Sequence, residues 1–121
     1  MRMPTATVEP FGVVAVPFPY IERPILKRRP VLIVSAPELA RRHGLLWVAM
    51  ITSADNPSWP DDVAIDDLPG AGLRKPSIVR PAKLATVEAA AVDVIGRASA
   101  GVADRVRAVL ESYLAPGSRS V

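Results

Sequence analysis

Apolar residues in this chain fall into short runs that end at prolines and turns, which is typical of β-strands. The continuous apolar runs over residues 30–35 and 45–52 predict strands buried on both faces, and we place Trp47 of the second run in the core. A β-branched run over residues 12–16 predicts an earlier strand that Pro17 ends. Shorter segments complete the predicted strands: residues 61–66, 76–80, 83–86 and 92–97, with a turn at 68–70.

Prolines restrict where helices can form. There are 13 of them, and between Pro4 and Pro81 the widest proline-free stretch is residues 38–56. Proline inside a helix costs about 3 kcal/mol, so we expect a long helix only after Pro81.

Two helices are predicted on capping signals. Pro37 is suited to the first turn of a short helix that Gly44 ends. Ser99 can cap a helix over residues 100–114, whose apolar residues recur at spacings of three and four. The predicted fold is mainly β (α+β): a bent antiparallel sheet, either a small barrel or a half-open roll, with a short helix after the second strand and a C-terminal helix.

Composition narrows the class of protein. The 121 residues suffice for one domain, and half of them are hydrophobic, as in globular proteins. The absence of cysteine excludes disulfides and thiolate zinc sites, and a single histidine, His43, excludes a two-histidine mechanism. We expect no metal, no cofactor and a surface position for His43. Residues 1–4 carry no apolar signal segment, so we expect the protein in the reducing cytoplasm.

Charge is distributed unevenly, although the net charge is only +3. Residues 21–42 hold six basic side chains against two acidic ones, and residues 55–67 hold five aspartates and no base. One interpretation is a solvated surface. The other is a groove for a polyanion with an acidic loop at its rim. Tyr20 and Trp59, on predicted loops, have the aromatic character that stacks on unpaired bases, although Trp59 suits a dimer contact equally well.

Arg29 is the most informative basic residue, because it directly precedes Pro30 at the start of an otherwise apolar strand. An arginine there can present its planar guanidinium to a phosphate and stabilise charge in a transition state. The alternative is that Arg28 and Arg29 only protect the strand from aggregation.

Several ordered segments resemble the MazF/PemK family of toxin endoribonucleases over about residues 10–114. The matching segments are residues 12–19, 27–35, 49–53, 72–73, 77–79, 83–87 and 95–96, followed by the amphipathic helix. The resemblance implies one domain with an SH3-like barrel core, short flexible tails and a homodimeric state. It also implies metal-independent cleavage of single-stranded RNA, often mRNA, and a cognate antitoxin in a type II toxin–antitoxin system.

The resemblance assigns the catalytic arginine to Arg29 and the catalytic threonine to Thr52. In the implied reaction the ribose 2′-OH attacks its own 3′-phosphate, Arg29 stabilises the pentacoordinate phosphate, and Thr52 positions a non-bridging oxygen. Glu22 is the candidate general base, with the alternative that it is a solvated charge paired with Arg23. The expected RNA contacts are Tyr20, Arg23, Lys27, Arg28, Ser53, Ser77 and Arg80.

Two departures from the family stand out: Val13 where many members have an acidic residue, and Pro24 in the loop after the first strand. Pro24 is expected to stiffen that loop and to affect the choice of target sequence. Two other functions stay open at this point, a non-catalytic toxin that binds a protein as gyrase poisons do, and an inactive RNA-binding barrel. The basic loop with Arg29 and Thr52 favours the ribonuclease.

Overall fold

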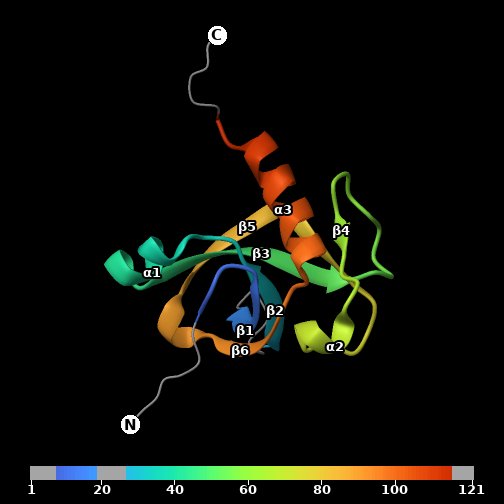
Figure 1. Cartoon of the computed structure of the whole chain (residues 1–121). Helices are drawn as coiled ribbons and strands as arrows, with labels where there is room; N and C mark the ends of the chain where they lie inside the picture. Colours follow the sequence, from blue (N-terminus) through green and yellow to red (C-terminus); the bar gives the residue numbers. More distant parts are fainter. Residues whose placement is uncertain (1–7, 19–26, 116–121) are drawn as a thin grey trace.

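The computed structural model describes residues 8–18 and 27–115. Within them, a single antiparallel sheet of six strands has the order β4-β5-β3-β2-β1-β6, and α3 lies across one of its faces (Figure 1). The strands are β1 (Gly12–Phe18), β2 (Lys27–Ile33), β3 (Leu45–Ser53), β4 (Val63–Ala64), β5 (Ser77–Glu88) and β6 (Asp93–Arg97). The helices are α1 (Pro37–His43), α2 (Leu68–Ala71) and α3 (Ala100–Tyr113), with a 3₁₀ turn at Ala89–Ala91. The predicted fold class is confirmed.

Both faces of the central strands are buried. On one face, Leu32 and Ala49 pack with Val102 and Val106 of α3. The other face carries a second apolar cluster, which consists of Val14, Val16, Val31, Ile33, Leu46 and Val48. Successive side chains of a strand point to opposite faces, so a continuous apolar run supplies both clusters.

Both predicted helices form, with the predicted caps. Gly44 ends α1 in the left-handed region at φ 67°, where glycine carries no Cβ penalty. Ser99 caps α3, its hydroxyl oxygen accepting a hydrogen bond from the Val102 amide at 3.2 Å. None of the helices in the described residues is long and apolar enough to cross a membrane.

Strand boundaries differ from prediction where pairing overrides local pattern. Strand β2 begins at Lys27 because residues 27–29 pair with residues 16–18 of β1, which itself runs through Pro17. The two strands predicted over residues 76–86 are one strand, β5. Its register against β3 shifts after the Ala49–Leu84 pair, so the fully buried Pro81 lies in a bulge. The predicted strand over residues 61–66 shrinks to β4, because Asp62 turns toward Arg80.

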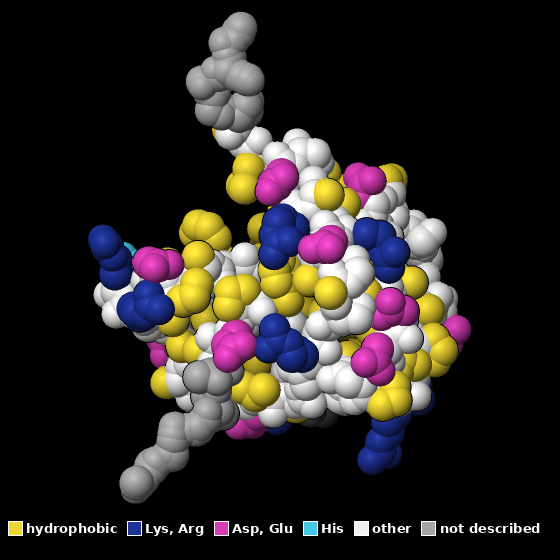
Figure 2. Space-filling view, in the orientation of Figure 1, with side chains coloured by type: hydrophobic (Ala, Val, Ile, Leu, Met, Phe, Trp, Pro, Cys, Tyr) yellow, Lys and Arg dark blue, Asp and Glu magenta, His cyan; other side chains and the backbone are white. Residues whose placement is uncertain are grey.

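The expectation that Trp47 is part of the core is wrong, since it is 49% exposed. Trp47 pairs with Thr86 on the part of the sheet face that α3 leaves uncovered, where an apolar hollow of about 370 Å³ opens between α1 and α3 (Figure 2). The turn predicted at residues 68–70 is instead the short helix α2, capped by the Asp67 side chain, which accepts from the Gly70 amide at 3.0 Å.

Candidate active site

Arg29 and Thr52 lie at the same end of the β2–β3 strand pair. The ladder between these antiparallel strands ends at Val31 and Met50. Arg29 stands two residues before that pair and Thr52 two residues after it, so both are placed on the same face as the pair. Register therefore brings together two residues that are 23 positions apart in the sequence.

Pro30 explains why the ladder stops there. On its other side β2 stays paired with β1 through Pro30 as far as Lys27, opposite Phe18. Proline has no N–H, so Pro30 cannot donate the hydrogen bond that would extend the ladder toward β3. The backbones of β2 and β3 are thus unpaired between Arg29 and Thr52.

The Arg29 side chain is exposed, and it forms no ion pair with another described residue. Its neighbour Arg28 is engaged: it donates to the Ala15 carbonyl at 3.0 Å and pairs with Asp93 at 2.7 Å. Arg28 thereby joins β2 to β1 and to the start of β6. Among the described residues, therefore, Arg28 has partners for its guanidinium, whereas Arg29 has no anionic partner.

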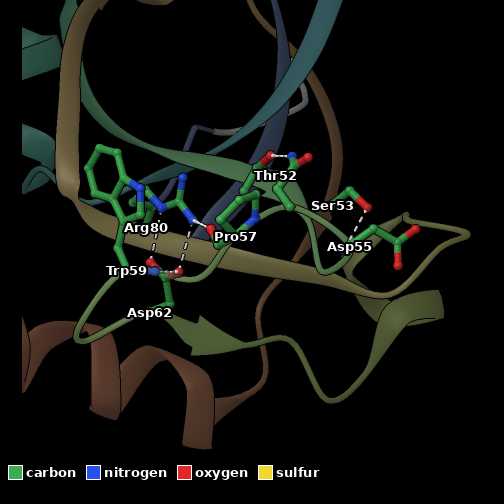
Figure 3. A network of polar contacts seen from close by, with 8 residues as sticks. Thr52, Ser53, Asp55, Pro57, Trp59, Asp62 and Arg80 are labelled. Carbon is green, nitrogen blue, oxygen red and sulfur yellow. Dashed lines mark hydrogen bonds and ion pairs between the residues drawn. The ribbon is translucent and has the colours of Figure 1, made fainter.

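The Thr52 hydroxyl has a partner that the sequence did not reveal. Asn56 donates its side-chain N–H to Thr52 Oγ1 at 2.6 Å (Figure 3). The turn between them is closed by the backbone N–H of Asn56, which donates to the Ser53 carbonyl at 3.1 Å. No motif marks Asn56, and its four-residue spacing from Thr52 acquires meaning only when the chain turns at the end of β3.

Arg80 anchors the segment of residues 54–62, called the 54–62 loop. Its guanidinium binds both carboxylate oxygens of Asp62, at 3.1 and 3.0 Å, and donates to the Pro57 carbonyl at 2.9 Å (Figure 3). The Trp59 ring covers it at 4.2 Å. The side chains of Arg80 and Asp62 are 10% and 8% exposed. The Arg80 guanidinium therefore bonds to groups of the protein itself. This structural role replaces its predicted contact with RNA.

Asp62 is held in its charged form. Burial alone would raise its pKa, but hydrogen bonds from Arg80 and from the Trp59 amide, with the charge of Arg80, outweigh burial and lower the pKa of Asp62. Charge and hydrogen bonding thus stabilise the anchor of the 54–62 loop.

The acidic segment lies at the surface, with every aspartate except Asp62 exposed, and most of its carboxylates are bound by other residues. Four of its five carboxylates bind within the protein: Asp62 as described, Asp61 to the Tyr113 hydroxyl at 2.7 Å, Asp66 to the Ser99 hydroxyl at 2.8 Å, and Asp67 as the cap of α2. The hydrogen bond that Tyr113 donates to Asp61 raises the pKa of that phenol. These aspartates connect the 54–62 loop and its continuation to β5 and α3.

The remaining predicted residues divide into two groups. Ser53 and Ser77 form a cross-strand pair beside Thr52, where Ser53 Oγ accepts from the Asp55 amide and Ser77 Oγ donates to the Lys75 carbonyl. Tyr20, Glu22 and Arg23, with Pro24, lie outside the described residues, as does the side chain of Lys27. His43 is exposed at the end of α1, as expected. Across the described ranges, His, Asp and Glu side chains nowhere gather in threes that could hold a metal ion.

The described residues form a small antiparallel β half-barrel with a C-terminal helix, the fold of MazF-like proteins. The chain belongs to the PemK-like, MazF-like toxins of type II toxin–antitoxin systems, since the model of that family matches residues 9–114. No curated protein matches the chain.

Solved structures share the fold at low sequence identity. MazF from Deinococcus radiodurans has a TM-score of 0.70 at 20% identity, over 90% of this chain and 97% of that one. An endoribonuclease from a mycobacterial species, in complex with its cognate antitoxin, has a TM-score of 0.67 at 18% identity, over 87% and 90%. The Mycobacterium tuberculosis toxin MazF-mt6 has 0.63 at 22%, over 84% and 93%.

Proposed function

We propose that this toxin is a metal-independent, sequence-selective endoribonuclease that cleaves single-stranded RNA, chiefly mRNA, and thereby inhibits growth. The observation that supports this best is the unpaired end of β2 and β3, where an exposed arginine and a threonine hydroxyl share one face. A guanidinium and a hydroxyl are complementary to a phosphodiester, because both donate hydrogen bonds to its oxygens.

The proposed reaction is an internal transfer of the phosphoryl group. The ribose 2′-oxygen forms a bond to its own 3′-phosphorus while the bond from phosphorus to the 5′-oxygen breaks. The products are a 2′,3′-cyclic phosphate and a 5′-hydroxyl, and the proton lost from the 2′-OH is balanced by one gained at the 5′-oxygen. Arg29 stabilises the added negative charge on phosphorus, and Thr52 donates to a non-bridging oxygen and orients the phosphate. Glu22 remains the proposed base.

Two partners belong to this proposal. A cognate antitoxin is supported by related structures solved as MazE–MazF complexes and by the mycobacterial endoribonuclease with its antitoxin. A second copy of this chain would cover the apolar hollow, which Trp47, Leu84 and Leu114 line at 49%, 46% and 62% exposure. Leu84→Glu should then yield a monomer in sedimentation, whereas Ala90→Glu, on an exposed turn, should leave the dimer intact.

The test is cleavage of a long single-stranded RNA by the purified protein in EDTA, with the new ends mapped chemically. We expect cleavage leaving 5′-hydroxyl ends, and its loss in Arg29→Ala. Arg42→Ala, which removes an exposed cation on α1, is the matched control and should cut normally. RNA that binds but stays intact would instead indicate an inactive RNA-binding barrel, and the absence of both binding and cleavage would favour a toxin that acts on a protein.

A further inference from the structure

We propose that Asn56 is a positioning residue that turns the Thr52 hydroxyl into a hydrogen-bond donor for the RNA phosphate. This inference rests on the proposed function and adds a residue to its site. It is drawn from the 2.6 Å contact in which Asn56 Nδ2 donates to Thr52 Oγ1.

The direction of this hydrogen bond determines what the hydroxyl can do next. A threonine hydroxyl offers one donor and two acceptor positions, whereas an amide nitrogen can only donate. When Asn56 occupies an acceptor position, the hydroxyl hydrogen stays available for an acceptor outside the pair. Phosphate oxygens are acceptors. The contact therefore leaves Thr52 in the state that a phosphate requires.

The position of Asn56 is restrained from both sides. On its N-terminal side, the backbone N–H of Asn56 donates to the Ser53 carbonyl at the end of β3. On its C-terminal side, the Pro57 carbonyl accepts from Arg80, which the buried Asp62 and the Trp59 ring hold in turn. An exposed asparagine on a free loop would sample several rotamers, but here the backbone on both sides is fixed and less ordering remains for substrate binding.

A second restraint comes from the last turn of α3. Tyr113 donates to Asp61 at 2.7 Å, so the 54–62 loop is attached to the helix as well as to β5. The loop thus has anchors on two elements that pack in the core, which suits a segment that must present one side chain accurately.

The decisive variant is Asn56→Asp, which keeps the shape but replaces the amide donor with a carboxylate. At neutral pH the carboxylate accepts from Thr52, so the hydroxyl hydrogen points away from the phosphate. We expect cleavage to slow by more than in Asn56→Ala, for which the loss is on the order of 10-fold. As pH falls through the titration of the new carboxyl, its protonated form donates again, so the rate relative to the parent protein should rise. The new charge also repels the RNA phosphate, so the profile is repeated on Thr52→Val: repulsion alone predicts the same rise there, whereas the orienting role predicts a smaller one.

A double-mutant cycle tests whether Asn56 acts through Thr52. Asn56→Ala should slow the parent protein but should add nothing to Thr52→Val, because the hydroxyl that it orients is already gone. Asp55→Asn, at an exposed site in the same loop, is the control and should cut at the parent rate. Additive effects, or a pH-independent ratio for Asn56→Asp, would overturn the inference.

One measurement separates this inference from the proposed function. In NMR spectra of the parent protein, one Asn56 side-chain amide proton should be shifted and protected from exchange, and Thr52→Val should abolish both effects. If the parent cuts no RNA, the proposed function fails. If the shift and exchange protection of the Asn56 side-chain amide proton are the same in Thr52→Val, the inference fails whatever the cleavage activity.

Discussion

Arg80 and Asp62 meet through two hydrogen bonds of 3.1 and 3.0 Å, in a place where both side chains are about nine-tenths buried. The same guanidinium holds the Pro57 carbonyl, one residue beyond Asn56. The contact that stabilises this end of the sheet is therefore also the contact that sets the position of the candidate site.

Asp62→Asn should destabilise the protein strongly. It removes the charge that compensates buried Arg80, and breaking such a pair from one side lowers the free energy of unfolding by about 3–5 kcal/mol. Urea denaturation measures the loss. Glu38→Gln is the control: it breaks an exposed pair with Arg41 on α1 and should change stability by less than about 0.5 kcal/mol. Equal effects would show that the Arg80–Asp62 pair is not shielded from water.

Stability should also fall in acid through Asp62. Its pKa is lowered in the folded protein, so its contribution is complete above the ordinary carboxyl pKa of about 3.9 and disappears as pH falls through the lowered value. Unfolding free energies of the parent protein should therefore drop more steeply than those of Asp62→Asn below about pH 4. Parallel curves would contradict the lowered pKa.

Two glycines should respond differently to alanine. A Cβ on Gly96 would overlap the backbone of Ala71 in α2, so Gly96→Ala should force β6 and α2 apart and lower stability by about 1–3 kcal/mol or more. Gly44 has φ +67° but open space around it, so Gly44→Ala should cost only about 1–2 kcal/mol of backbone strain. Hydrogen exchange should report local opening at β6 in Gly96→Ala alone.

Ser99→Ala should loosen the start of α3. The hydroxyl both caps the helix and donates to Asp66, so its loss should lower the unfolding free energy by about 1–2 kcal/mol. Ser112→Ala removes a hydroxyl that donates to the Val109 carbonyl on the exposed side of the same helix, and should stay within about 0.5 kcal/mol of the parent. Thermal melts of both variants provide the comparison.

The adjacent arginines should separate stability from activity. Arg28→Ala breaks the contacts with Ala15 and Asp93 and should lower the melting temperature slightly, since the pair is partly exposed. Arg29→Ala should leave the melting temperature unchanged and abolish cleavage of RNA. The reverse pattern would mean that the phosphate-binding residue has been assigned to the wrong position.

Local pattern was sufficient for much of the fold. The apolar runs located β1 and β3, and the signals at Gly44 and Ser99 located the ends of the helices, because each depends on neighbouring residues. Trp47 was misplaced because its exposure depends on how far α3 extends over a sheet face, which no run of residues encodes.

The site was less accessible to such reasoning. The position of Arg29 before Pro30 singled it out, but Thr52 was assigned only by resemblance to a family, and their common face is evident only from the β2–β3 register. The burial of Arg80 depends on Asp62, which precedes it by 18 residues. A basic residue that reads as a surface cation from its neighbours can thus be the centre of a buried network, and Asn56 acquires its partner only through the turn that this network holds.

Pro30 has a consequence for how this site could be closed without altering either Arg29 or Thr52. Pro30→Ala restores the missing N–H donor. The hydrogen-bonded ladder between β2 and β3 can then continue beyond the Val31–Met50 pair. The space between Arg29 and Thr52 would then be filled by backbone pairing, and the protein would gain sheet while losing its opening. In this chain, one absent hydrogen atom marks the border between the paired scaffold and the candidate active site.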